Sequence, residues 1–166
     1  MSKELSYKLL RIVYSAMRVA EGRIMQVFIP YPSLEQSIRC LDNSRLGNQI
    51  YREALTLLRG GWPNHPASKL WANYKPALAQ YCLYGMAELR RRNSSPPTAT
   101  VLVFEFKRYI NNQPIILPPF IGYEPFHISH QDNLIFKAPW YYGPIFNRPI
   151  PQTKPDYIWP LNISQK

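Results

Sequence analysis

The sequence predicts a mainly α-helical protein, a compact single-domain helical bundle with an extended aromatic and proline-rich C-terminal tail. Apolar residues recur three and four positions apart along several segments, which is typical of helices with one buried face. The 166 residues suffice for one hydrophobic core, and the apolar fraction of 46% excludes a disordered chain. Most of the 17 prolines fall in the second half, where they favour extended segments.

The first segment, residues 3–20, carries apolar side chains at helical spacing and predicts an amphipathic helix. It is too charged for a secretory signal, and docking on the domain is favoured over a membrane-surface or organelle-targeting role. An apolar extended run begins at Met25 and stops at Pro30 and Pro32. We therefore expect residues 1–24 to be an appended N-terminal helix and residues 25–166 to be a single helical domain.

Two helices are expected next. Ser33 as N-cap and Gln36 three residues later form a capping box for a short helix that ends near Cys40. A second helix begins at about Asn43 and stops at the glycine pair 60–61.

The segment after the tight turn WPNHP is also helical by its spacing, but Pro76 interrupts it. Either the helix is kinked there, or Pro76 opens a new helix. The expected buried stripe of this helix consists of Leu78, Tyr81, Cys82, Gly85, Met86 and Leu89. The arginines 90–92 close it, either as a phosphate-binding patch or as a solvated helix end.

The remaining elements follow the linker NSSPPT. The run VLVFEFKRYI fits a strand by composition, but its helical surroundings favour a helix. PIILPPFIGYEP is expected to be extended, and FHISHQDNLIFK to be a final helix stopped by Pro139. From Trp140 on, the chain is predicted to lie over the helices as a tail.

The charge and the cysteines indicate the class of partner and compartment. A formal charge of +10 is spread along the chain, which favours binding to a phosphate backbone over a role in solubility alone. Cys40 and Cys82 are isolated, as thiols of a reducing compartment are. Since there is no apolar run long enough for a bilayer, we expect a cytoplasmic protein, or one associated with the nucleoid or nucleus, that binds double-stranded DNA.

The helix over residues 43–59 separates into two faces when wound at about 100° per residue. Arg45, Gln49, Arg52 and Thr56 form a polar stripe beside an apolar face. Glu53 lies at the seam, where partial burial would raise the pKa of its carboxyl group and the arginines would lower it. Such a carboxylate beside phosphate-binding arginines fits acid–base chemistry on a nucleic acid, while an ordinary surface Arg–Glu pair is the alternative.

Three motifs resemble a known family. Tyr-Arg-Glu-Ala-Leu at residues 51–55 resembles the Arg-Glu helix of the pyrimidine-dimer DNA glycosylase family of the phage endonuclease V type. GWPNHPASKLW resembles the Asn-His-Pro segment of its bacterial relatives. HISHQDNLIFKAPWYYGPIF resembles the C-terminal helix and aromatic tail of small bacterial and viral proteins grouped with it, so the similarity runs from about Met25 to Pro160.

The resemblance implies a DNA repair enzyme with a compact helical fold that needs no metal or other cofactor. Such an enzyme flips out a base opposite the lesion, sharply kinks the duplex and cleaves the N-glycosidic bond. An α-amino group forms a Schiff base with the sugar, and a glutamate drives the β-elimination at the abasic site. Here Glu53 would be that glutamate, and Arg52 and Arg45 would contact phosphates. Because 24 residues precede Met25, the amine of Met1 or Ser2 would have to fold back onto Glu53. Otherwise the protein is a glycosylase that uses activated water, or a binder.

The histidines are further candidates for contacts with DNA. His127 and His130 are three residues apart on a predicted helix and can face one way, whereas His65 lies in a tight turn where capping is the alternative. The expected DNA-binding residues are Arg45, Gln49, Arg52, His65, His127, His130 and Lys137. Trp140, Tyr141 and Tyr142 would either stack on bases or plug the core.

Two other functions stay open. The first is a non-catalytic nucleic-acid-binding protein on the same scaffold, and the second is a nuclease whose metal is held by the three histidines. We expect no metal, because no carboxylate is spaced to support those histidines. No obligate protein partner is inferred.

Overall fold

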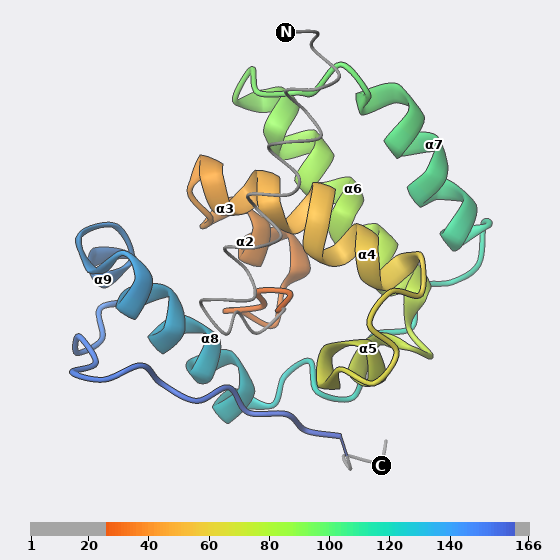
Figure 1. Ribbon diagram of the computed structural model, residues 1–166. Coiled ribbons are helices and arrows are strands. Elements are labelled where there is room, and N and C mark those ends of the chain that lie inside the picture. Colours follow the sequence, from red (N-terminus) through yellow and green to blue (C-terminus); the bar gives the residue numbers. More distant parts are fainter. Residues whose placement is uncertain (1–25, 162–166) are drawn as a thin grey trace, which may run out of the picture.

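The computed structural model describes residues 26–161, and this part of the chain is helical and contains no β-strand (Figure 1). The prediction of a mainly α-helical fold is therefore confirmed. The helix expected over residues 3–20 lies outside the described residues. The elements in order are α2 (Leu34–Arg39), α3 (Asn43–Asn48), the π-helical turn η1 (Gln49–Glu53), α4 (Ala54–Leu58), α5 (Pro66–Trp71), α6 (Lys75–Arg91), α7 (Ala99–Ile110), α8 (Glu124–Lys137) and α9 (Pro139–Phe146).

The first helices begin at side-chain caps, and the sequence predicts the first of them. The Ser33 hydroxyl accepts a hydrogen bond from the Gln36 amide at 3.1 Å and so starts α2. Asp42 caps α3 in the same way. The rod formed by α3, η1 and α4 ends at Gly60, whose φ of +77° is a left-handed conformation that glycine adopts without strain.

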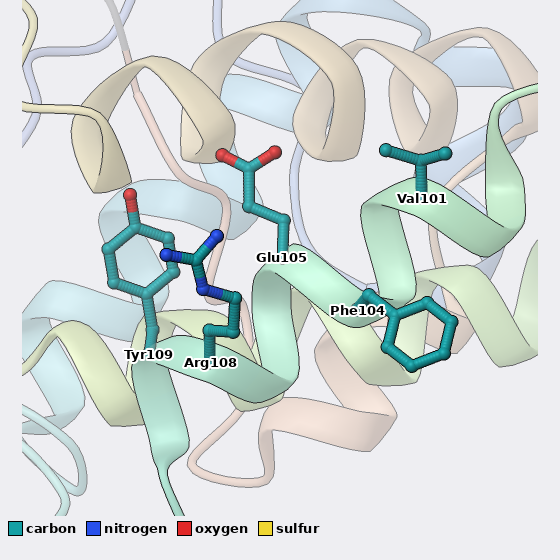
Figure 2. A pocket seen from close by; sticks show the side chains of 5 residues that line it. All are labelled: Val101, Phe104, Glu105, Arg108 and Tyr109. Carbon is teal, nitrogen blue, oxygen red and sulfur yellow. The ribbon is translucent and has the colours of Figure 1, made fainter.

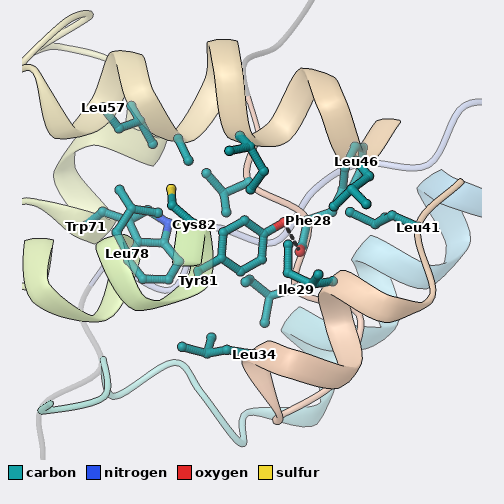
Figure 3. Packing of buried hydrophobic residues seen from close by; sticks show 14 of the residues in the cluster. Phe28, Ile29, Leu34, Leu41, Leu46, Leu57, Trp71, Leu78, Tyr81 and Cys82 are labelled. Atoms are coloured by element: carbon teal, nitrogen blue, oxygen red, sulfur yellow. Dashed lines mark hydrogen bonds between the residues drawn. The ribbon is translucent and has the colours of Figure 1, made fainter. Parts of the chain in front are cut away.

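Helix α6 is the centre of the core and contacts α2, α4 and α7. It begins with Pro76 in its first turn, so Pro76 opens a new helix rather than kinking one. The stripe predicted for α6 is buried, and Figure 3 shows Tyr81, Cys82 and Leu78 pointing into the apolar cluster. Gly85 lets α6 approach η1 closely, because a Cβ there would lie 2.2 Å from Cδ1 of Ile50.

Helix α7 packs on α6, which confirms the preference for a helix over a strand in this segment. Its outer face is apolar and exposed at Val101 and Phe104. Figure 2 shows these side chains with Glu105, Arg108 and Tyr109 around a shallow surface pocket.

The C-terminal region differs in part from the expectation. The extended tail was predicted to begin at Trp140, and that is wrong for residues 139–146, which form α9. Pro139 is tolerated in the first turn because its missing N–H would have no partner inside the helix. The helix ends at Asn147 with a φ of +49°. The remaining tail is extended and runs alongside α8 toward α5 (Figure 1).

Within residues 26–161, none of the helices combines the length and the apolar character needed to cross a membrane.

Candidate active site

The π turn η1 lies in the middle of the rod that carries Glu53. The amide of Ala54 donates to the carbonyl oxygen of Gln49, five residues back, so this turn holds one residue more than an α-helical turn. The extra residue rotates the side chains that precede it relative to those that follow. Turns of this kind are frequent at functional sites.

Gln49 is consequently inside the protein, and the prediction that it lies on a polar stripe is wrong. Its side chain is 2% exposed. Its amide nitrogen donates to the carbonyl oxygen of Gln26 at 3.0 Å, and its oxygen accepts from the amide of Phe28 at 2.8 Å and the hydroxyl of Tyr81 at 3.2 Å. The side chain of Gln49 therefore joins the segment 26–28 by hydrogen bonds to the turn that carries Glu53.

Glu53 itself is half-buried, which confirms its position at the seam. One of its carboxylate oxygens, Oε2, is buried. The phenol of Tyr157, from the C-terminal tail, feels the charge of this carboxylate. Burial raises the pKa of Tyr157, the charge of Glu53 raises it further, and the charge of Arg45 opposes both. The carboxylate, the guanidinium group and the phenol are therefore within electrostatic range of one another.

Arg45 is positioned by an ion pair and an aromatic ring. It lies 2.7 Å from Oδ2 of Asp42, and its guanidinium carbon is 5.7 Å from the centre of the Tyr142 ring. The Tyr142 hydroxyl donates to the same carboxylate at 2.6 Å. Burial alone would raise the pKa of Asp42, but the hydrogen bonds from Tyr142 and Arg45 lower it below its usual value. The Arg45 side chain is thus fixed while remaining 27% exposed.

Arg52 and Lys137 are the other two basic residues that we predicted to bind DNA. Arg52 is half-buried on η1, and its Nη1 lies 3.5 Å from Oδ1 of Asn48. Lys137 is exposed at the end of α8.

The histidines of α8 hold the extended N-terminal segment. Nδ1 of His130 accepts from the amide of Ile29 at 2.8 Å, and Nδ1 of His127 donates to the carbonyl oxygen of Ile29 at the same distance. The two imidazoles therefore bind both polar backbone groups of one residue. Gln131 adds a hydrogen bond to the Pro30 carbonyl at 2.8 Å.

Both α8 imidazoles are neutral at neutral pH because of this burial. Burial, with a contribution from the charge of His127, lowers the pKa of His130 to about 3. Burial also lowers the pKa of His127, and its hydrogen bond to Ile29 offsets part of that change. The expectation that these side chains face outward toward DNA is wrong, because α8 turns them into the core.

His65 joins the tail to α5. Its Nδ1 accepts from the amide of Ala67 at 3.1 Å, which confirms the alternative that it caps a helix. Its ring is 5.7 Å from that of Trp159, and Trp159 is 5.9 Å from Tyr157. In the described part of the chain, no group of three metal-ligating side chains is placed to hold an ion, so the three-histidine nuclease finds no support.

Other predicted contacts also have structural roles. Tyr142 is buried, as the core-plug alternative requires, whereas Trp140 is 78% exposed. Arg92 donates to the carbonyl oxygens of Leu41 and Arg39, so it joins α6 to α2 and is not part of a phosphate patch.

Sequence reasoning missed Tyr157 and Trp159. Both lie in a segment that was treated only as a covering tail. The aromatic residues of this segment could have indicated its role. An extended segment needs apolar side chains to pack it against the rest of the protein, and aromatic side chains supply the largest apolar surfaces.

The comparisons with known proteins bear on the first part of the chain. Residues 25–100 match the model of the pyrimidine dimer DNA glycosylase family. The match includes α2 to α6, η1 and Glu53, and stops before the C-terminal motifs. No curated protein and no solved structure matches the chain. The resemblance that the motifs around Glu53 indicated is thus confirmed, since residues 25–100 are similar to the pyrimidine dimer DNA glycosylase family.

Proposed function

We propose that the protein is a DNA repair N-glycosylase that removes a damaged or modified base of the pyrimidine-dimer type and cleaves the abasic site that remains. The observation that carries this proposal is the family match across the segment in which Glu53 sits on a π turn. The formal charge of +10 supports a DNA substrate, because binding to phosphates releases counterions.

Glu53 is the proposed catalytic carboxylate. Its half-buried position within electrostatic range of Tyr157 supports this role, since a general base needs a fixed position and a partly water-excluded site. In the β-elimination it would remove a proton from the sugar next to C1′, and the 3′ phosphate would leave.

Arg45, Arg52, Lys137 and His65 are the proposed contacts to DNA. Arg45 and Arg52 lie on the same rod as Glu53, and a guanidinium group can bind a phosphate through two N–H groups. Gln49, His127 and His130 belong to the site in a different way, because they position the segment that lies against η1.

The nucleophile is proposed to be an α-amino group, as the family resemblance implies. The carbonyl of Gln26 is tied to Gln49, four residues before Glu53, so a chain that starts at Met25 would carry its amine one residue from this anchor. The amine attacks C1′ and loses a proton, and the base leaves with the bonding electrons. The sugar ring then opens as the C1′–O4′ bond breaks and O4′ takes up a proton, which gives the Schiff base that borohydride reduces to a stable amine.

Borohydride trapping on duplex DNA with a pyrimidine dimer or an abasic site tests the nucleophile. The full chain is compared with one that starts at Met25, and we expect a covalent adduct that is stronger with the shorter chain. If neither chain gives an adduct while both release the base, the glycosylase uses activated water and the amine step is wrong.

The substitution Glu53→Gln tests the carboxylate. We expect it to lower turnover by about 10²- to 10⁴-fold while binding persists. Glu124→Gln is the control, because Glu124 is an exposed carboxylate at the start of α8. If the wild type binds DNA in a salt-sensitive way but turns over no lesion, the proposal of an enzyme is refuted and the protein is a non-catalytic binding protein.

A further inference from the structure

The loop between α4 and α5 contains a backbone conformation that its residue type does not favour. The non-glycine residues with positive φ in the described chain are Trp62, Asn93, Asn111, Asn112 and Asn147. Asparagine tolerates this region, but a bulky residue such as tryptophan is strained there. Trp62 has a φ of +55°. Strained residues of this kind cluster at functional sites.

Hydrogen bonds on both sides fix this conformation. The amide of Gly61 donates to the carbonyl oxygen of Thr56 at 2.8 Å, and the carbonyl oxygen of Trp62 accepts from the amide of His65 at 2.9 Å. The indole itself remains 56% exposed. The fold therefore holds a large aromatic ring at the surface at a cost in backbone strain, and burial of the ring does not explain that cost.

Trp62 is connected by a backbone hydrogen bond to a short row of aromatic rings. The ring of Tyr157 is 5.9 Å from that of Trp159, and the ring of Trp159 is 5.7 Å from that of His65, measured between ring centres. The amide of His65 donates to the carbonyl oxygen of Trp62, and the charge of Glu53 acts on Tyr157 at the other end of the row. Figure 1 shows the end of the tail beside α5, where these elements meet.

The surroundings of this loop suit a nucleic acid. Pro63 and Asn64 next to Trp62 are exposed, so the ring is accessible. Lys69 on α5 and Arg59 at the end of α4 are exposed and flank the loop with positive charge, although Arg59 also pairs with Glu105 at 2.8 Å. In DNA, stacked bases lie between two phosphate backbones. An accessible aromatic ring could stack on the bases while cationic side chains near it contact the phosphates.

We propose that Trp62 enters the DNA base stack as a wedge, at the position vacated when a base is flipped out. This inference rests on the proposed function and adds the side chain that stabilises the opened duplex. Indole stacks on any base because every base has a π face, so the wedge tolerates different sequences around the lesion. Insertion of an apolar side chain also kinks the duplex, which exposes the flipped nucleotide.

Binding to a non-reactive abasic analogue tests the wedge without any turnover. The full chain is titrated with two duplexes, one intact and one with a tetrahydrofuran residue opposite 2-aminopurine. We expect tighter binding to the second duplex and a change in 2-aminopurine fluorescence as the indole stacks on it. Trp62→Ala should lower this preference by roughly 5- to 100-fold and remove the fluorescence change, with affinity for intact duplex unchanged.

Three variants make the result specific. Trp62→Phe should keep most of the preference, because phenylalanine also stacks. Trp62→Gly should lose the preference for the abasic duplex. Because glycine adopts the positive φ without strain, a loss in this variant cannot come from a misfolded loop. Phe104→Ala is the control, because Phe104 is a 65% exposed aromatic residue on α7 outside the row.

The outcomes separate this inference from the proposed function. If Trp62→Ala and Trp62→Gly bind and respond like the wild type while the wild type turns over lesions, the wedge alone is wrong. An equal loss in Phe104→Ala would overturn the wedge too. If the wild type binds neither duplex, the wedge and the proposed function both fail.

Discussion

Acidification from pH 7 to pH 5 should weaken the fold through His130. The pKa of this histidine is about 3 in the folded protein and about 6.5 in an unfolded chain. Between these values the unfolded state binds more protons, so stability rises with pH and is lost as the pH falls below about 6.5. pH 5 lies about 1.5 units below the pKa of the unfolded state, so the fold loses about 2 kcal/mol of stability at about 1.36 kcal/mol per unit.

Urea unfolding of the wild type and of His130→Asn at both pH values measures this effect. The asparagine oxygen can accept the hydrogen bond from the Ile29 amide, but the side chain does not titrate. The variant should be less stable at pH 7, because it loses ring contacts with Phe126 and Tyr157. Its further loss on going to pH 5 should be about 2 kcal/mol smaller than that of the wild type.

His65→Asn is the matched control. Asparagine is a good N-cap, and His65 is only half-buried, so this variant should keep most of the wild-type loss between pH 7 and pH 5. Some pH dependence remains in His130→Asn, because burial also lowers the pKa of His127. If His130→Asn and the wild type lose the same stability, His130 is not a buried neutral imidazole and the reasoning is refuted.

Four further substitutions give independent tests. Gly85→Ala should destabilise the fold by about 1–3 kcal/mol in thermal unfolding, because its Cβ would overlap a side chain of η1. Gln49→Leu should cost about 2–4 kcal/mol in urea unfolding and should also lower turnover, because it leaves the buried amide of Phe28 and the carbonyl oxygen of Gln26 without their hydrogen-bond partner. Hydrogen bonds from two arginines lower the pKa of Glu88 to about 2. Glu88→Gln should therefore lower the free energy of unfolding by about 2 kcal/mol at pH 7. The effect should be much smaller near pH 2, because the wild-type carboxylate is protonated there and no longer stabilises the fold. Trp62→Gly should be about 1 kcal/mol more stable than Trp62→Ala in the same assay, and equal stabilities would contradict the strained loop.

Local signals predicted most of the helices. The Ser33 cap, the glycine stop at 60–61 and the proline at 76 each act within one turn of the chain, so their effect can be seen in the sequence. The same holds for the stripe of α6, whose six residues are all buried.

The candidate site was less predictable, because it depends on contacts far apart in the chain. A single extra residue in η1 turned Gln49 inward, and helical-wheel reasoning assumes a constant angle per residue. The pairing of His127 and His130 with Ile29 spans about 100 residues, and no local pattern encodes it. The helix α9 was missed because two prolines and a glycine in eight residues usually indicate irregular structure.

The tail that delivers Tyr157 and Trp159 has a consequence for the time at which the protein becomes functional during its synthesis. A ribosome makes the chain from the N-terminus, so α2 to α7 emerge before α8, which adds Phe126, Leu134 and Ile135 to the core. The neighbourhood of Glu53 is complete only when the last described residues have emerged, since Tyr157 comes almost at the end. A nascent or prematurely terminated chain would therefore present most of the helical core without Tyr157, and we expect the proposed function to be absent until the tail has emerged.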